Sequence, residues 1–280
     1  MSRHIGVCSW SLQPASASQL VERLEPTGAT YVQLALDPLR TGAWPEADAL
    51  ETLRAAGVQV LSGMVETAGE DYSTLESIRE TGGLRPDATW DVNREAASAN
   101  AKLARRMGLD LISFHAGFLP EEPGDPEREK LVGRLREFVD RFAAEGVRCA
   151  FETGQESAPT LAAFLEELDH ESIGVNFDPA NMLLYDKGDP VEALALLSPW
   201  VRQIHVKDAN RTRTPGTWGE EVPAGTGEVD WDGFFDVVAA RGLDVDLVIE
   251  REAGDARVAD IATARALVDA QLRRIGSQEA

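Results

Sequence analysis

Residues 148–178, RCAFETGQESAPTLAAFLEELDHESIGVNFD, decide the fold class because two short apolar runs flank one amphipathic segment. The apolar runs predict strands at Arg148–Glu152 and Gly174–Asp178, and the segment between them predicts a helix at Leu161–Leu168. A strand, a helix and a second strand in this order predict two parallel strands joined by a crossover helix.

The same unit recurs along the whole chain. Six further apolar runs predict strands at Ile5–Ser9, Tyr31–Leu36, Gln59–Gly63, Leu111–His115, Arg202–Val206 and Leu247–Glu250. Longer amphipathic segments predict helices at Ala17–Leu24, Glu46–Ala56, Thr89–Met107, Glu127–Ala144, Pro190–Leu197, Trp231–Ala240 and Ala256–Arg274. Eight such strands in 280 residues predict one α/β domain over residues 1–280, a single closed (β/α)8 TIM barrel. A doubly wound open sheet is the alternative, but no GxGxxG follows the first strand.

The composition excludes several classes of function. The net charge is −21, which repels phosphate backbones and anionic lipids and disfavours a nucleic-acid-binding or membrane-surface protein. No apolar stretch approaches the length of a membrane span, and the N-terminus lacks the apolar region of a secretory signal. A cytoplasmic protein is therefore expected, with Cys8 and Cys149 as buried, reduced thiols.

Three connections are longer than a minimal barrel needs, and all three follow the C-terminal end of a predicted strand. They are Glu66–Asp87, Gly117–Asp125 and Asn210–Val229. Active sites of such barrels are built from these loops, so we expect the catalytic face at this end of the barrel.

Four polar residues lie near the ends of the later apolar runs. Glu152, Asp178 and Glu250 end their runs, and His205 lies inside its run, one residue before the end. Taken singly, each has an ordinary structural explanation, such as a helix cap or a hydrogen-bonded core histidine. Together, three carboxylates and one imidazole around a barrel axis match a hard or borderline divalent cation, and without one the carboxylates would repel one another. We expect Mn²⁺, with Mg²⁺ or Co²⁺ as alternatives, rather than a structural zinc ion.

The motifs that carry these residues are FETG (151–154), NFDPANM (176–182), IHVKDANR (204–211), GTGEVDW (225–231) and VIERE (248–252). In these motifs the chain resembles the xylose-isomerase-like TIM barrels, the sugar isomerase and epimerase superfamily, and within it the tagatose and psicose 3-epimerases. The resemblance implies that the four residues bind a divalent metal and that Glu152 and Glu250 are also the catalytic acid–base pair. It further implies that Arg211, six residues after the histidine, binds substrate.

The chain departs from the 3-epimerases in the residues expected to bind substrate. Asn181 stands where they carry a histidine, and Ala158 stands where they carry a glutamate, which leaves Glu156 as the nearby substitute. His115 is expected to bind a substrate hydroxyl, Lys207 an oxyanion, and Trp10, with Trp218 and Phe118, an apolar sugar face. Core packing or a surface ion pair is the alternative for these side chains. The departures leave the identity of the sugar open.

The expected activity is the epimerisation or isomerisation of a ketose or keto-sugar derivative through an enediolate, with the two glutamates moving the proton. A lyase or dehydratase acting on an inosose or a 3-keto-glycoside at the same site is the alternative. A relative of endonuclease IV is disfavoured by the four histidines and the acidic charge, and a non-catalytic subunit by the intact glutamate pair. A small-molecule sugar is the expected partner, together with a homodimer or homotetramer of the chain.

Overall fold

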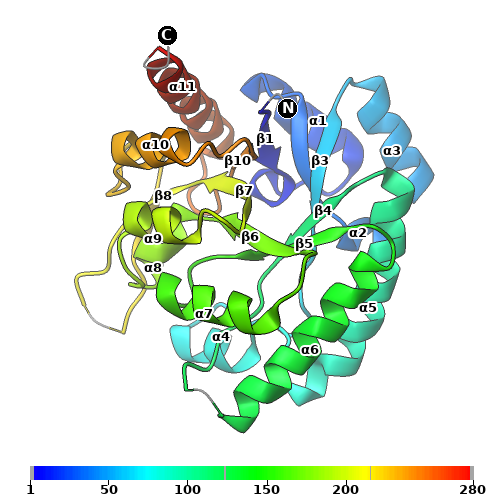
Figure 1. Cartoon of the computed structure of the whole chain (residues 1–280). Helices are drawn as coiled ribbons and strands as arrows, with labels where there is room; N and C mark the ends of the chain where they lie inside the picture. Colours follow the sequence, from blue (N-terminus) through cyan, green and yellow to red (C-terminus); the bar gives the residue numbers. More distant parts are fainter. Residues whose placement is uncertain (1–2, 123, 215, 278–280) are drawn as a thin grey trace.

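Eight parallel strands close into a barrel in the computed structural model, which describes residues 3–122, 124–214 and 216–277 (Figure 1). The strands are β1 (Ile5–Cys8), β2 (Tyr31–Ala35), β3 (Gln59–Met64), β4 (Leu111–Phe114), β5 (Arg148–Glu152), β6 (Ile173–Phe177), β7 (Val201–Val206) and β10 (Asp246–Ile249). Around the barrel they follow the order β1-β10-β7-β6-β5-β4-β3-β2. Each bound lies within one residue of its sequence-based prediction, and the TIM-barrel fold is confirmed.

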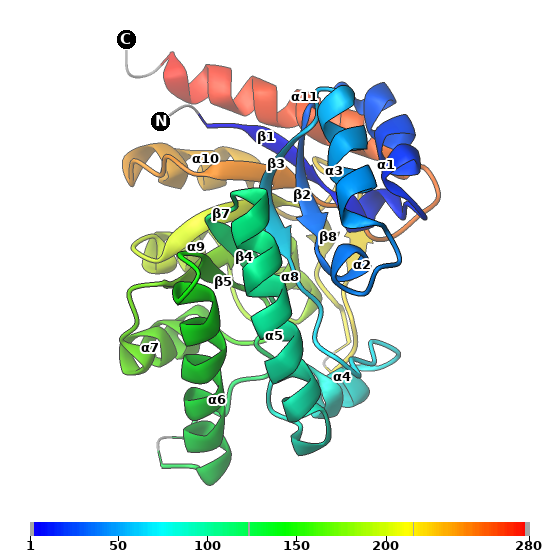
Figure 2. The same cartoon turned by 90° about the vertical axis from the view of Figure 1, so that its right-hand side faces the viewer.

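Helices cover the outside of the barrel, and Figure 2 shows α5 and α6 side by side on this outer layer. The long helices are α1 (Ala17–Leu24), α3 (Glu46–Ala55), α5 (Asp87–Met107), α6 (Pro126–Ala143), α7 (Ala158–Leu168), α9 (Pro190–Leu197), α10 (Trp231–Ala240) and α11 (Arg257–Gly276). Helix α7 begins three residues before the predicted Leu161. Ser157 caps this earlier start by accepting a hydrogen bond from the Thr160 amide.

Several short elements were not predicted, because none is long enough to show a hydrophobic period. They are η1 (Ser9–Leu12), η2 (Glu25–Thr27), α2 (Asp37–Arg40), α4 (Leu75–Thr81), α8 (Pro179–Leu184) and the antiparallel pair β8 (Asp208–Asn210) and β9 (Glu220–Val222). Helix α4 lies in the first long connection and starts with a capping box of Thr74 and Ser77. The β8–β9 hairpin lies in the third. Two of the three expected long loops therefore contain regular structure.

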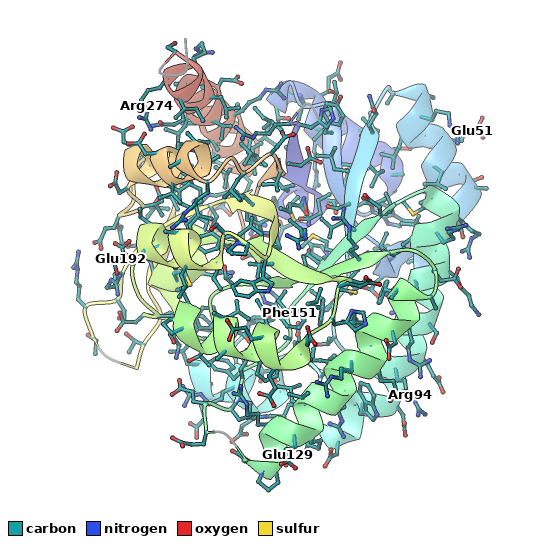
Figure 3. The ribbon with its side chains drawn as sticks, viewed as in Figure 1. Glu51, Arg94, Glu129, Phe151, Glu192 and Arg274 are labelled. Atoms are coloured by element: carbon teal, nitrogen blue, oxygen red, sulfur yellow. The ribbon has the colours of Figure 1, made fainter. Side chains whose placement is uncertain are left out.

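The main apolar core lies between the barrel and its helices. In Figure 3, Phe151 of β5 points into the interior, whereas Glu51, Glu129 and Glu192 lie on the outer helices. Both cysteines are buried free thiols, as predicted, and burial raises the pKa of each. Among the described residues, no helix combines the length and the apolar character needed to cross a membrane.

Two groups of side chains fill the inside of the barrel, one apolar and one polar. A small apolar cluster holds Cys8, Ala35, Met64 and Val248. A buried polar layer holds Gln33, Ser62, Ser113 and Gln203, each at most 1% exposed. The inner layers of TIM barrels are dominated by bulky branched apolar residues, so a polar layer needs a reason. That reason lies directly beyond it, at the C-terminal ends of the strands.

Candidate metal centre and active site

Glu152, Asp178, His205 and Glu250 meet in the barrel mouth, although they come from four different strand regions. One potential ligand atom from each lies within 4.8 Å of every other. All four are buried, with Asp178 and His205 fully enclosed. The strand order explains the convergence, because β10, β7, β6 and β5 are consecutive in the barrel wall. The structure thus brings together the four residues that the sequence singled out.

The two carboxylate oxygens of Asp178 have different roles, because one accepts hydrogen bonds in a helix cap and the other faces the cluster. It caps α8, since its Oδ1 accepts hydrogen bonds from the amides of Ala180 at 2.8 Å and Asn181 at 3.0 Å. Its Oδ2 is buried without a hydrogen-bond partner and faces the cluster, 3.8 Å from Nδ1 of His205. The Pro179 ring suits the first turn of this helix, where an amide proton would be unpaired. The cap therefore fixes the direction of the free oxygen.

Hydrogen bonds also fix the orientation of the His205 ring. Its Nε2 lies 2.8 Å from Oε1 of Gln33, which can only accept a hydrogen bond, so Nε2 carries the proton. Nδ2 of Asn176 also lies 2.9 Å from Nε2, and turning this amide over would bring its Oδ1, which has no partner, into position to accept from the protonated Nε2. This leaves Nδ1 to the cluster, 3.2 Å from Glu250 and 3.4 Å from Glu152.

This donor set fits a divalent cation. The two buried atoms without a hydrogen-bond partner, Oδ2 of Asp178 and Nδ1 of His205, both point to the centre of the cluster. An unpaired buried polar atom costs free energy, and a cation between them and the two glutamates would satisfy both atoms. Three carboxylates with one imidazole suit Mg²⁺, Mn²⁺ or a related ion rather than a thiolate-seeking metal.

Lys207 adds a positive charge beside the cluster. Its buried Nζ donates to Glu250 at 3.0 Å and to Glu252 at 2.6 Å, and it lies 3.4 Å from Oδ2 of Asp178. Burial alone would raise the pKa of Asp178, but Lys207 and His205 outweigh it and hold that pKa well below its ordinary value. Burial lowers the pKa of Lys207, but the surrounding carboxylates outweigh it. The pKa therefore lies well above its ordinary value, and Lys207 stays charged. Lys207 therefore offsets part of the cluster's negative charge and does not form the surface ion pair that was the alternative expectation.

The polar layer beneath the cluster holds Gln33 in place. The Nε2 of Gln33 donates to Oγ of Ser113 and to Oε1 of Gln203, both at 3.0 Å, and Ser62 in turn bonds Gln203. Sequence reasoning missed this layer. The available signal was a glutamine inside each of two apolar strands, YVQLA and VRQIHV.

Glu152 and Glu250 have different neighbours. Asn181 donates to Oε1 of Glu152 at 3.1 Å, and Nε2 of His115 lies 3.8 Å from its Oε2. Burial raises the pKa of Glu152, but the charges of His115 and His205 outweigh it, so the pKa lies below its ordinary value. Glu250 instead accepts from Lys207. The two carboxylates come from strand ends that are not adjacent, because β7 and β6 stand between β10 and β5.

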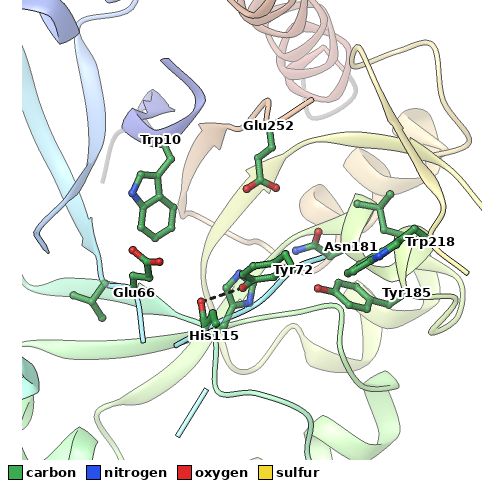
Figure 4. A pocket seen from close by; sticks show the side chains of 11 residues that line it. Trp10, Glu66, Tyr72, His115, Asn181, Tyr185, Trp218 and Glu252 are labelled. Atoms are coloured by element: carbon green, nitrogen blue, oxygen red, sulfur yellow. Dashed lines mark hydrogen bonds between the residues drawn. The ribbon is translucent and has the colours of Figure 1, made fainter. Parts of the chain in front are cut away.

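A cavity of about 490 Å³ lies next to the cluster and opens at the same face of the barrel (Figure 4). Four of the residues expected to contact substrate line it: Trp10, His115, Asn181 and Trp218. The other lining residues were not predicted as substrate contacts, and they are Val65, Glu66, Glu70, Tyr72, Leu184, Tyr185 and Glu252. Asn181 and His115 connect this cavity to Glu152.

Two expected substrate residues lie elsewhere. Glu156 is buried and lines a neighbouring cavity of about 430 Å³ together with Arg79 and Lys187. Burial raises its pKa to about 8. Arg211 forms an ion pair with Asp186, Nη1 to Oδ1 at 2.7 Å, and its Nη2 donates to the Gly188 carbonyl at 2.8 Å. Neither side chain is among those lining the larger cavity.

Asp208 explains the GTGEVDW motif. Its carboxylate accepts hydrogen bonds from the amides of Gly225 and Gly227 and from the indole of Trp231. A Cβ at Gly227 would lie 2.2 Å from Oδ1 of Asp208, so the loop can wrap this closely only with glycine there. The motif therefore ties the loop after the hairpin to the end of β7.

The comparisons with known proteins place this site in context. The sequence profile of the family described as "Xylose isomerase-like TIM barrel" matches residues 14–273. A xylose isomerase domain protein from Planctomyces limnophilus is 30% identical, with a TM-score of 0.89, over 99% of this chain and 100% of that one.

More distant structures share the fold. An L-ribulose 3-epimerase is 18% identical with a TM-score of 0.74, over 99% of this chain and 97% of that one. A Mycobacterium smegmatis protein of the same fold, in complex with magnesium, is 16% identical with a TM-score of 0.72, over 98% of each chain. Among curated proteins, the Escherichia coli (strain K12) protein YihM is 34% identical over 62 residues, 22% of this chain. That match spans about a fifth of the curated relative's length, 19%.

Proposed function

Because the chain belongs to the xylose isomerase-like TIM barrel family, we propose that it is a divalent-metal-dependent sugar epimerase or isomerase that works through an enediolate. The observation that carries this proposal is the buried set of Glu152, Asp178, His205 and Glu250 beside a cavity large enough to admit a sugar. The structures of 3-epimerases and of a magnesium complex with the same fold support it. We propose Mn²⁺ as the ion.

The bound cation would supply the positive charge that polarises the substrate carbonyl and stabilises the negative charge developing beside it. Glu152 and Glu250, which come from strand ends separated by β7 and β6, would remove and return the proton on the carbon next to the carbonyl. Transfer between the two faces of one carbon gives an epimer, whereas transfer between adjacent carbons gives an aldose–ketose pair.

The neighbours of each glutamate suit this work. Asn181 holds one oxygen of Glu152 and leaves the other near His115, which faces the cavity and is placed to bind a substrate hydroxyl. Lys207 holds Oε2 of Glu250. Both carboxylates are therefore fixed before a sugar enters, which lowers the cost of reaching the reactive geometry.

The charge of the cavity favours an uncharged sugar. Glu66, Glu70 and Glu252 line it. Burial raises the pKa of Glu66, and repulsion from Glu70 and Asp37 raises it further. A phosphate or carboxylate on the substrate would add to this repulsion. Carboxylates are good acceptors for hydroxyl groups, so a neutral polyol is the matching ligand.

The deciding experiment incubates the Mn²⁺-loaded protein in D₂O with ketoses, inososes and 3-keto-glycosides and follows deuterium by mass spectrometry and NMR. The proposal expects one deuterium on the carbon next to the carbonyl, with no other change of mass. Loss of water or of an aglycone would replace it with a lyase or dehydratase. Absence of exchange with every sugar, in protein shown to hold its metal, would overturn it.

A further inference from the structure

We propose that the cavity contains an outer subsite, the aromatic wall of Leu184, Tyr185 and Trp218, which binds a second ring attached to the reacting sugar. The substrate would then be a disaccharide or another glycoside, rather than a free monosaccharide. This inference rests on the proposed function, because it takes the metal cluster as the place where the reacting sugar is held.

The wall is built from two elements that are distant in sequence. Tyr185 directly follows α8, and Trp218 lies in the β8–β9 hairpin loop. Their rings stand edge to face with centroids 4.7 Å apart, and the Phe118 ring supports Tyr185 from behind at 6.0 Å. Both rings are half-buried and line the cavity. Rings in this setting offer a large apolar surface together with a polar edge, which suits the face of a sugar.

The wall and the metal cluster lie at opposite ends of α8. Asp178 caps the start of this helix and Tyr185 follows its end, seven residues later, which is about 10 Å along the helix axis at 1.5 Å per residue. Asn181, which contacts Glu152, lies between them on the same helix. Figure 4 shows Asn181 between Trp10 and Glu66 on one side of the cavity and Tyr185 and Trp218 on the other. In the proposed arrangement the reacting ring lies at the cluster and the second ring stacks on the wall, with Asn181 between them.

The wall is held rigidly in place. The Arg211–Asp186 ion pair and the Arg211–Gly188 hydrogen bond join the hairpin loop to the end of α8. The amide of Gly219 donates to the Leu184 carbonyl at 3.0 Å. A Cβ at Gly219 would lie 2.5 Å from the Asn210 carbonyl oxygen, so the loop approaches this closely only because the residue is glycine. A surface formed before the ligand arrives loses less entropy on binding.

The size and charge of the cavity agree with such a ligand. Its volume of about 490 Å³ falls within the roughly 300–1,000 Å³ of sites that enclose ligands larger than one sugar ring. Tyr72, half-exposed at 44%, stands over the middle of the cavity, where it would contact the link between two rings. The acidic groups Glu66, Glu70 and Glu252 disfavour an anionic substituent, so the second ring is a neutral one.

The test compares unreactive sugar alcohols, which lack the carbonyl and so report binding alone. Isothermal titration calorimetry of the Mn²⁺-loaded protein would measure the affinities for sorbitol and for maltitol, which is sorbitol carrying a glucosyl ring. We expect maltitol to bind at least about tenfold more tightly. In Trp218→Ala this ratio should fall to within about twofold, whereas Trp90→Ala on α5, outside the cavity, should keep the wild-type ratio.

Equal affinities for the two alcohols, or an equal loss for both in Trp218→Ala, would overturn the outer subsite. The second result would mean that the wall contacts the reacting sugar itself. Thermal unfolding of both variants checks that the fold survives. The D₂O exchange experiment judges the proposed function separately, so exchange without a maltitol preference rejects only the subsite. A maltitol preference without exchange rejects only the epimerase or isomerase.

Discussion

Oε1 of Gln33 lies 2.8 Å from Nε2 of His205, so a side chain of β2 orients a candidate metal ligand of β7 across the barrel. Both residues are buried, and the amide nitrogen of Gln33 is itself held by Ser113 and Gln203. The polar layer thus serves the cluster above it. It fixes the protonated nitrogen of the ring and leaves the other nitrogen facing the candidate metal centre.

Replacing Gln33 tests this relationship. Gln33→Met keeps the approximate volume but removes the acceptor, so His205 loses the bond that fixes its ring. We expect Mn²⁺ affinity, measured by isothermal titration calorimetry, to fall about 10- to 100-fold. Ser113→Ala, which removes a partner on the far side of Gln33, should cost clearly less. An unchanged affinity in Gln33→Met would show that the polar layer does not orient the ligand.

The two glutamates are expected to be essential for turnover. Glu152→Gln and Glu250→Gln each retain the shape but lose the proton acceptor, so the rate of deuterium exchange should fall about 10²- to 10⁴-fold or more. Circular dichroism should show an unchanged fold. Because both residues are also candidate ligands, the metal content must be measured in each variant. Glu166→Gln, on the exposed face of α7, is the matched control. Robust exchange in either glutamate variant would contradict the two-base assignment.

The barrel was predictable because its signals are local. Each strand is a short apolar run, each long helix has a clear period, and polar residues such as Asp178 and His205 interrupt these runs where the strands meet. Once eight strands are known to close a barrel, their C-terminal ends must converge. The four-residue cluster follows from that geometry, without knowledge of any loop.

The residues around the cluster were less predictable, because loops and side-chain pairing decide their positions. Arg211 has the spacing of a substrate ligand, yet Asp186, which adopts a left-handed backbone at the end of α8, pairs with it. Tyr72 enters the cavity through a connection expected to be a plain loop. Gln33 was not predicted as a functional residue because a single polar residue in a strand produces no periodic pattern.

The Arg211–Asp186 pair gives a direct test of the role of Arg211. If the pair only holds the aromatic wall, Arg211→Gln and Asp186→Asn should each raise the KM for a substrate by a similar, small factor. About two- to fivefold is expected for a partly exposed pair. The double variant should then be no worse than either single one, as a double-mutant cycle reports. A large rise in KM for Arg211→Gln alone, with Asp186→Asn near wild type, would instead place Arg211 on the substrate.

Glu156 predicts a pH dependence of stability that its variant should lack. Burial raises its pKa in the folded protein from an ordinary value of 4.5 to about 8. Between these two values the folded chain keeps a proton that the unfolded chain has released, so the free energy of unfolding falls as the pH rises through this window.

Glu156→Gln keeps a neutral, hydrogen-bonding side chain and removes this titration. Relative to wild type, the variant should therefore gain stability from pH 5 to pH 8, by at most about 1.4 kcal/mol per pH unit, as measured by urea unfolding at each pH. Groups elsewhere titrate alike in both proteins, so the difference between their profiles isolates Glu156. The exposed Glu166→Gln should run parallel to wild type. Parallel profiles for Glu156→Gln and wild type would mean that Glu156 is ionised in the folded protein, with a charged group or solvent reaching its cavity.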